Sequence, residues 1–349
     1  MLVQPGFIIL LGSGETAPTM QKVYDWLFKQ LVPPVSLAIV ETPAGFQPNS
    51  AQVAGDIADF ITQRLQNYHP AVSVIPARRR EAPFSTDDPA LLADLLRANV
   101  IFMGPGSPTY AVRHLRDSRA WHTITARHRL GTALIFASAG TIAVGAQALP
   151  VYEIYKAGAD LHWQPGLNLL APFGLPVVFM PHWNNTDGGE GLDTSRCYMG
   201  RQRFKQLVGL LPEDIPLVGI DEHTALAFNP TAQTGQVMGN GGVTLMRGGQ
   251  EKIFESGQSF DLSELGPFRL PAPAAGIPSD IWQWVEQTLV QADQQPAPDP
   301  ALLILVDRRT DARARKDWST ADALRADIEA QGWQVLDTPS GPVLQPIND

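Results

Sequence analysis

Short apolar runs alternate with helix-length segments through most of the first 221 residues, and this alternation limits the folds open to the chain. The runs are residues 7–11, 36–41, 72–75, 100–103, 133–137, 177–180 and 217–221. Continuous apolar runs of this length are typical of strands that are buried on both faces. Helical segments between them indicate parallel strands joined by crossovers. The sequence therefore predicts an α/β protein with a mainly parallel, doubly wound sheet covered by helices on both faces.

The pattern changes after residue 221, which predicts further parts of the chain. Residues 225–228, 236–238 and 242–245 alternate with turn sequences and resemble a small antiparallel meander. Prolines are then frequent, which is typical of a linker. We predict three parts: a main domain at residues 1–265, a proline-rich linker with one helix at 266–300, and a small helical module at 301–349. In the module, Ser319 and Asp322 have capping-box spacing, and the helix they open is expected to end at Gly332.

Charge and cysteine content exclude several classes of function. The formal net charge is −9, so the overall field repels nucleic acid and anionic membranes. With Cys197 as the only cysteine, neither an internal disulfide nor a zinc site built from cysteines can form. We interpret the apolar start at residues 7–11 as a strand rather than a leader, and we expect a cytoplasmic protein without a membrane segment.

A serine lies where one of these apolar runs meets a helix-compatible stretch. Ser138 follows residues 133–137 and precedes Ala139 and Gly140. A sharp turn from strand to helix exposes a nucleophile above the sheet edge and directs backbone N–H groups toward its reaction product. Ser138 is therefore the candidate nucleophile.

A serine nucleophile needs a base and an acid that orients the base. His182 follows the run at 177–180 and is the best placed of the seven histidines. Asp221 and Glu222 end another run, and strand alternation lets only one of them face the site. Glu153, after the serine's own helix, is a rival acid, and His223 is a second candidate base. The residues alone leave these alternatives open.

The oxyanion that forms during acyl transfer needs two backbone donors near Ser138. The N–H of Ala139, directly after the serine, is one candidate. The loop after the run at 100–103 would supply the other. Pro105 has no N–H, so Gly106 is the expected donor there.

Five motifs in order along residues 1 to 250 resemble the dipeptidase E and cyanophycinase family of serine hydrolases, which has the class I glutamine amidotransferase-like fold. They are residues 12–15 (GSGE), 102–106 (FMGPG), 138–140 (SAG), 181–185 (PHWNN) and 219–226 (GIDEHTAL). The resemblance implies that Ser138 is the nucleophile and His182 the base. It favours Glu222 as the acid through the GIDE motif, whereas the dipeptidase branch would place the acid nearer Glu153.

Two positions depart from the family pattern. Phe136 stands two residues before the serine, where family members usually have glycine, and Pro105 separates two glycines that are usually adjacent.

The C-terminal module carries a resemblance of its own. Residues 309–318, 321–325 and 337–341 resemble the C-terminal end of cysteinyl-tRNA synthetases. Basic and acidic residues are interleaved there, so we interpret the module as a docking element in preference to a tRNA contact.

The sequence thus predicts a serine hydrolase of peptide, isopeptide or related amide bonds, acting on a small substrate. No P-loop, dinucleotide fingerprint or paired-histidine zinc motif occurs, so we expect neither a cofactor nor a metal. The alternative is a catalytically silent binding or regulatory protein of the same fold, whose C-terminal module recruits tRNA or a protein. The oligomeric state is left open, with a homo-oligomer among the alternatives.

Overall fold

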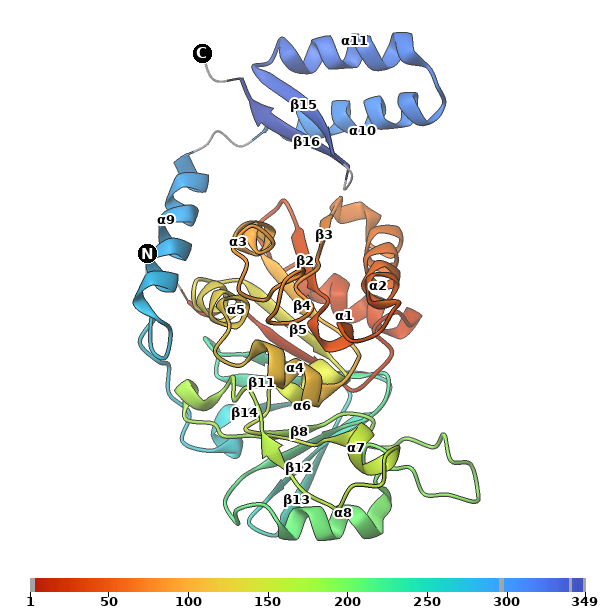
Figure 1. Ribbon diagram of the computed structural model, residues 1–349, viewed down its shortest axis with the longest axis vertical. Helices are drawn as coiled ribbons and strands as arrows, with labels where there is room; N and C mark the ends of the chain where they lie inside the picture. The colour runs from red at the N-terminus through yellow and green to blue at the C-terminus, as the bar shows by residue number, and fades with distance from the viewer. Residues whose placement is uncertain (1–3, 295–297, 339–340, 348–349) are drawn as a thin grey trace. The chain divides into compact units, whose positions relative to one another are not determined.

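The computed structural model describes residues 4–294, 298–338 and 341–347, and the chain divides into two compact units, Met1–Val285 and Glu286–Asp349 (Figure 1). The first unit extends past the predicted boundary at residue 265 to Val285, and Trp284 packs against its core. Part of the predicted linker, residues 295–297, lies outside the described residues. Within the described ranges, no helix is long and apolar enough to cross a membrane.

An eight-stranded sheet forms the centre of the first unit. Its order is β14-β11-β10-β1-β5-β4-β2-β3, and the five strands from β1 to β3 in that order are parallel. The strands are β1 (Ile8–Leu11), β2 (Ser36–Val40), β3 (Ala71–Ile75), β4 (Val100–Met103), β5 (Ala133–Ala137), β10 (Thr224–Asn229), β11 (Thr234–Gly239) and β14 (Ser259–Asp261). The predicted mainly parallel α/β fold is confirmed.

Both faces of this sheet are buried, as the apolar runs predicted. Ile8 and Leu10 pack into one core cluster, while the intervening Ile9 and Leu11 pack into another on the opposite face. The first cluster includes side chains of α4 (Pro108–Leu115) and α5 (Arg119–Arg129), and the second includes side chains of α1 (Pro18–Phe28) and α2 (Ser50–Arg64). Helices therefore cover the two faces in pairs, which makes the sheet doubly wound.

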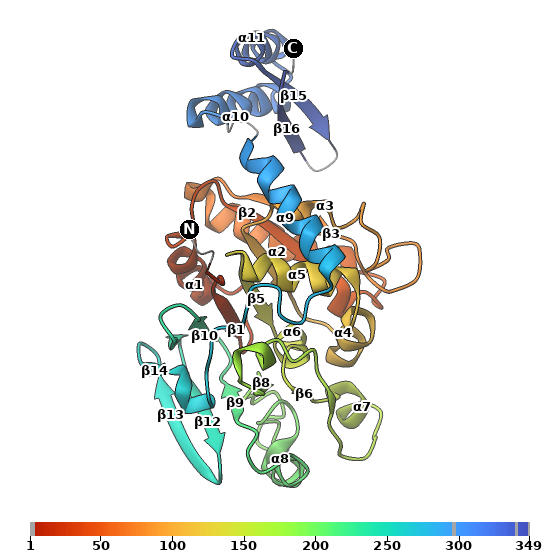
Figure 2. The ribbon, with the colours of Figure 1, turned by 90° about the vertical axis from the view of Figure 1, so that its left-hand side faces the viewer.

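Two predicted strands belong to a second sheet. β8 (Val178–Met180) pairs in parallel with β9 (Leu217–Ile220), and the order is β13-β12-β9-β8. β12 (Gly242–Arg247) pairs with β9 and β13 (Gln250–Glu255), not with β11, so the predicted three-stranded meander is wrong in its last strand. Figures 1 and 2 show β8 and β12 grouped apart from β2 and β3. Apolar runs indicate burial and do not specify the partner strand.

The remaining elements of the first unit are short, apart from the last helix, which extends into the second unit. They are α3 (Ala93–Arg97), α6 (Ala139–Ala143), β6 (Gln147–Ala148), α7 (Val151–Tyr155), β7 (Gln164–Pro165), α8 (Gly200–Gly209), α9 (Ser279–Gln294) and the 3₁₀ helices η1 (Thr42–Ala44), η2 (Gln66–Tyr68), η3 (Ala171–Phe173) and η4 (Leu262–Leu265).

The second unit pairs two helices with a hairpin. These are α10 (Pro300–Ala314), α11 (Trp318–Glu329), β15 (Trp333–Thr338) and β16 (Gly341–Pro346). Leu302, Val306, Ile328 and Val335 form its core, and Arg309 makes two hydrogen bonds of 2.9 and 3.0 Å to the carboxylate of Asp337. The predicted helical module is present, together with a hairpin.

The start of α11 differs from the predicted capping box. Asp317, not Ser319, caps the helix, because its Oδ1 accepts the N–H of Thr320 at 3.2 Å. α11 ends at Glu329, and Gly332 follows with a left-handed φ of 82°.

Phe136 gives a test of the core. Its side chain is 1% exposed and packs in the first core cluster. We expect Phe136→Ala to lower the free energy of unfolding by about 3–5 kcal/mol, because it removes a fully buried ring and leaves a cavity. Phe46→Ala is the control, with an expected loss of about 1 kcal/mol or less since this ring is 49% exposed. Urea unfolding followed by fluorescence measures both free energies of unfolding. Equal losses in the two variants would contradict the assignment of Phe136 to the core.

Candidate active site

Ser138 lies at the junction of β5 and α6 in a backbone conformation that L residues rarely adopt. Its φ is 50° and its ψ is −109°. The Thr141 hydroxyl stabilises the turn, because its oxygen lies within hydrogen-bond distance, 3.0 Å, of the carbonyl oxygens of both Leu11 and Phe136. A Cβ at Gly140 would lie 2.4 Å from the carbonyl oxygen of Met103, so this position requires glycine. The sharp turn is present with Phe136, and not glycine, two residues before the serine.

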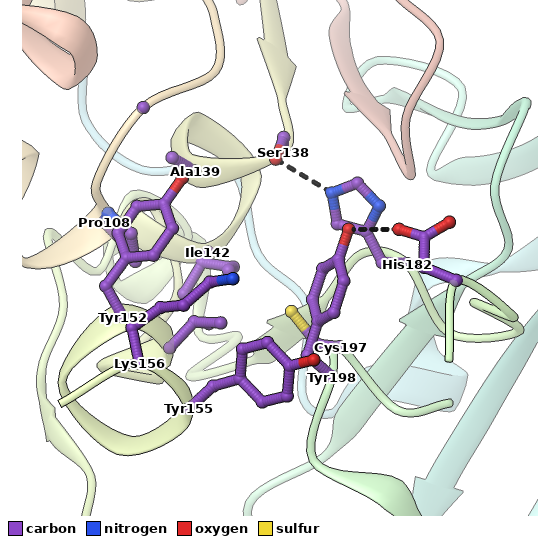
Figure 3. A pocket seen from close by; sticks show the side chains of 13 residues that line it. Pro108, Ser138, Ala139, Ile142, Tyr152, Tyr155, Lys156, His182, Cys197 and Tyr198 are labelled. Atoms are coloured by element: carbon purple, nitrogen blue, oxygen red, sulfur yellow. Dashed lines mark hydrogen bonds between the residues drawn. The ribbon is translucent and has the colours of Figure 1, made fainter. Parts of the chain in front are cut away.

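His182 follows β8 in the second sheet and contacts Ser138 across the two sheets. Its backbone N–H donates to Gly12 O at 3.1 Å, and its φ is 53°. Its Nε2 lies 2.9 Å from Ser138 Oγ (Figure 3). The predicted pairing of these two side chains is therefore present, although β8 does not belong to the same sheet as β5.

Glu222 is the carboxylate that meets His182. Its Oε1 lies 2.9 Å from His182 Nδ1 and accepts a second hydrogen bond of 2.9 Å from Asn185 Nδ2. The backbone N–H of Glu222 donates to Asn184 Oδ1 at 2.8 Å. The hydrogen bond from His182 lowers the pKa of Glu222, and the Asn185 amide adds to the effect against the opposing influence of burial.

The other sequence candidates lie elsewhere. Asp221 Oδ2 accepts the N–H of Gly242 at 2.9 Å, and burial raises the pKa of this carboxyl. Glu153 lies in α7 and lines a different cavity, with Oε2 buried and unpartnered in the described chain. The His223 backbone N–H donates to Ser13 Oγ at 3.3 Å, and its ring is packed against Gly14. Of the three carboxylates proposed from sequence, Glu222 is the one that contacts His182.

Gly106 and Ala139 border the same cavity as Ser138. Gly106 has a φ of 145°, and a Cβ there would lie 2.0 Å from the carbonyl oxygen of Pro43, so no other residue fits. Neither its N–H nor that of Ala139 donates to an acceptor within residues 4–294, 298–338 and 341–347. Two backbone donors beside the serine are therefore available to a ligand.

The cavity above Ser138 has a volume of about 410 Å³. The described residues that line it are Gly106, Pro108, Ser138, Ala139, Ile142, Val151, Tyr152, Tyr155, Lys156, His182, Asp187, Cys197 and Tyr198 (Figure 3). Tyr198 donates its hydroxyl to Asp187 Oδ2 at 2.9 Å, and burial, the first of several causes, raises the pKa of this tyrosine. Burial also raises the pKa of Cys197 to about 12, which keeps it a neutral thiol near pH 7.

Sequence reasoning missed part of the cavity wall. Tyr152, Tyr155 and Lys156 line it from α7 and the residue after that helix, and the Lys156 ammonium lies 5.0 Å from the Tyr155 ring centre. Their spacing at i, i+3 and i+4 places them on one helix face, which was a usable signal. Tyr198 gave no such signal, because it projects from a loop in which Arg196, Cys197 and Tyr198 all have φ between 56 and 67°.

Comparison with solved structures supports the fold. The chain is similar to the crystal structure of a peptidase from an acI-B1 Actinobacterium, with a TM-score of 0.60 and 22% identity over 75% of this chain and 98% of that one. A putative peptidase E protein from Listeria monocytogenes EGD-e matches with a TM-score of 0.44 and 13% identity over 72% of this chain. The first of these likenesses shows that the two proteins share a fold.

Comparison with curated proteins identifies a different likeness in a C-terminal segment. The chain is 29% identical over 99 residues to the cysteine–tRNA ligase of Streptomyces coelicolor, and 46% identical over 50 residues to that of Frankia casuarinae. These matches cover 28% and 14% of this chain, but only 16% and 10% of the ligases, so the chain spans a small part of their length. No protein-family model matches the chain.

The lowered pKa of Glu222 predicts how stability depends on pH. The folded protein keeps this carboxyl ionised to lower pH than the unfolded chain does. The resulting stabilisation is present above the ordinary glutamate pKa and is lost as the pH falls through the lowered one. Below about pH 5 we therefore expect the free energy of unfolding to fall less steeply in Glu222→Gln than in the wild type. Urea unfolding at a series of pH values measures this, and equal slopes would contradict it.

Proposed function

We propose that the protein is a serine hydrolase that cleaves peptide, isopeptide or related amide bonds. The observation that carries the proposal is the unbroken chain of contacts from Ser138 Oγ to His182 Nε2, and from His182 Nδ1 to Glu222 Oε1, each of 2.9 Å. A nucleophile, a base and an orienting acid in contact are the constellation that acyl transfer by a serine requires. The fold shared with a protein described as a peptidase is consistent with this chemistry.

The geometry suits the following sequence of steps. Ser138 Oγ attacks the substrate carbonyl carbon while His182 Nε2 takes its proton, and the carbonyl oxygen becomes an oxyanion. The N–H groups of Gly106 and Ala139 hold that oxyanion. His182 then gives the proton to the leaving nitrogen, and the amine departs from the acyl-enzyme. Water, deprotonated by His182, cleaves the ester and regenerates Ser138.

Glu222 acts in this scheme by orienting His182. Its carboxylate accepts a hydrogen bond from Nδ1–H, which fixes the tautomer in which Nε2 carries no proton and faces Ser138, and it stabilises the imidazolium that forms. Asn184 and Asn185 hold the acid in place through its backbone N–H and its Oε1. The Lys156 ammonium and the Asp187 carboxylate both line the cavity, which suits a short peptide with charged groups of both signs.

Removal of the nucleophile is the direct test. We expect a fluorophosphonate probe to label the wild type and not Ser138→Ala, because the probe forms a bond to an activated serine oxygen. Hydrolysis should fall on the order of 10⁶-fold in the same variant. Ser195→Ala is the matched control and should keep both signals, since this serine hydrogen bonds to Asp193 outside the cavity.

Two results would overturn the proposal. One is a wild type that takes no label and cleaves no member of a library of dipeptides and isopeptides. The other is labelling of Ser138→Ala at the wild-type rate.

The identity of the acid is tested by a pair of isosteric variants. Glu222→Gln should lower kcat on the order of 10⁴-fold, because an amide in place of the carboxylate favours the wrong tautomer of His182. Glu153→Gln is the matched control, since this residue lines another cavity, and it should change kcat less than about tenfold. Steady-state kinetics measures both. A large loss in Glu153→Gln with a small one in Glu222→Gln would reverse the assignment.

Neither departure from the family pattern favours the catalytically silent alternative. Phe136 is in the core and does not line the cavity, and Pro105 leaves the Gly106 N–H without an acceptor in the described chain.

For the C-terminal unit we propose a docking role. Six basic and seven acidic side chains lie between residues 301 and 347, and this balance does not favour tRNA binding, which needs an excess of cations. The similarity to cysteine–tRNA ligases covers too little of those enzymes to transfer their activity.

A further inference from the structure

A cavity of about 340 Å³, called the second cavity below, is built from residues that line neither the cavity of Ser138 nor the cavity of Glu153. It lies among α5, the segment 166–172 and the loop 275–277, all within the first unit.

Arg129, at the end of α5, lines this cavity and is 4% exposed. Its Nε and Nη1 are buried with no hydrogen-bond partner in the described chain, and its guanidinium lies 4.5 Å from the Phe173 ring centre. Arg129 therefore borders the cavity with at least two guanidinium N–H groups that no acceptor in the described chain satisfies. Arg127, two residues earlier, instead donates to Ala98 O at 2.6 Å.

A nearly buried guanidinium with unpartnered N–H groups is a favourable binding point for an anion. Burial lowers the pKa of Arg129 to about 10, so it is still a cation at neutral pH. A nearly buried charge without a counter-charge is costly, and a bound anion would remove that cost.

The other charged groups of the cavity leave one positive charge in excess. Arg116 is bound to the carbonyls of Pro165 and Gly166. Asp117 contributes one carboxylate, and burial lowers the pKa of His122, which favours its neutral form. Among the side chains that line the cavity, two arginines against one aspartate leave one positive charge, and Asp87 and Asp280 act on His122 from outside the lining.

The remaining walls are largely apolar, and include Trp121, Leu167, Leu169, Pro172 and Ile277. A fully hydrated inorganic ion gains nothing from such walls, whereas an organic body does. We propose that this cavity binds a small organic monocarboxylate, with the carboxylate at Arg129 and the apolar body against Trp121 and Ile277.

Occupation of this cavity would also act on the catalytic helix. Segment 166–169, which forms one wall, makes four backbone hydrogen bonds to the residues at and after the end of α6. Leu167 N–H donates to Ala143 O at 2.7 Å, Leu169 to Val144 at 3.0 Å, Asn168 to Gly145 at 2.9 Å and Gly166 to Ala146 at 3.0 Å. A ligand that holds this wall would therefore slow hydrogen exchange at residues 166–169.

Calorimetric titration of the full-length protein tests the proposal with acetate, butyrate, phenylacetate and indole-3-acetate. We expect saturable binding by at least one of the larger acids, and at least tenfold weaker binding of the neutral phenylacetamide. Inorganic phosphate should bind more weakly than the best carboxylate. The best ligand should also slow hydrogen exchange at residues 166–169.

Variants locate the site. Arg129→Gln should weaken binding at least tenfold, and Thr125→Trp, which fills the cavity from the partly buried face of α5, should do the same if Arg129→Gln does not fold. Arg127→Gln removes a buried guanidinium from the same helix but outside the cavity, and should leave binding unchanged.

Three outcomes would overturn the proposal: no binding by any carboxylate, equal binding of phosphate, or undiminished binding in Thr125→Trp. None of these measurements depends on hydrolysis, so they stand apart from the test of Ser138.

Discussion

The end of β1 is the point on which the site depends, because three groups from distant segments bond to two adjacent carbonyl oxygens there. Leu11 O accepts the backbone N–H of Ser138 at 3.4 Å and the hydroxyl of Thr141 at 3.0 Å. Gly12 O accepts the N–H of His182 at 3.1 Å, and the N–H of Gly12 donates to Thr224 O at 2.9 Å. A Cβ at Gly12 would lie 2.0 Å from Asp221 O, so only glycine lets these chains meet. Ser138, His182 and the strand after Glu222 are thereby held against one strand end.

This junction also joins the two sheets of the first unit. Ser138 comes from the end of β5 in the large sheet, whereas His182 and Glu222 follow β8 and β9 in the small one. Side chains held on the ends of rigid strands keep their spacing better than side chains on free loops, which matters for a contact of 2.9 Å. One wall of the second cavity, segment 166–169, is hydrogen bonded to Ala143 at the end of α6 and to the three residues that follow it, whereas Ala139 and Ile142 of the same helix line the cavity of Ser138.

Much of the architecture was predictable from local pattern. All seven apolar runs form strands, and the serine between strand and helix has the strained backbone that the turn requires. The partners of β8, β9 and β12 were not predictable, because an apolar run marks a segment for burial without choosing its neighbour. The boundary predicted at residue 265 differs from that of the first compact unit for a related reason: proline content suggested a linker, whereas the unit extends to Val285 and Trp284 packs against its core.

The sequence by itself determined which segments are buried and that Ser138 follows one of them at a sharp turn, since both follow from local chemistry. The residues alone did not decide among Asp221, Glu222 and Glu153, and the family resemblance only favoured Glu222, because that choice depends on how separate elements pack. The folded chain turns the Asp221 carboxylate to the N–H of Gly242 and leaves Glu222 to His182. Only tertiary structure decided this, because adjacent residues point in different directions and their partners come from distant parts of the chain.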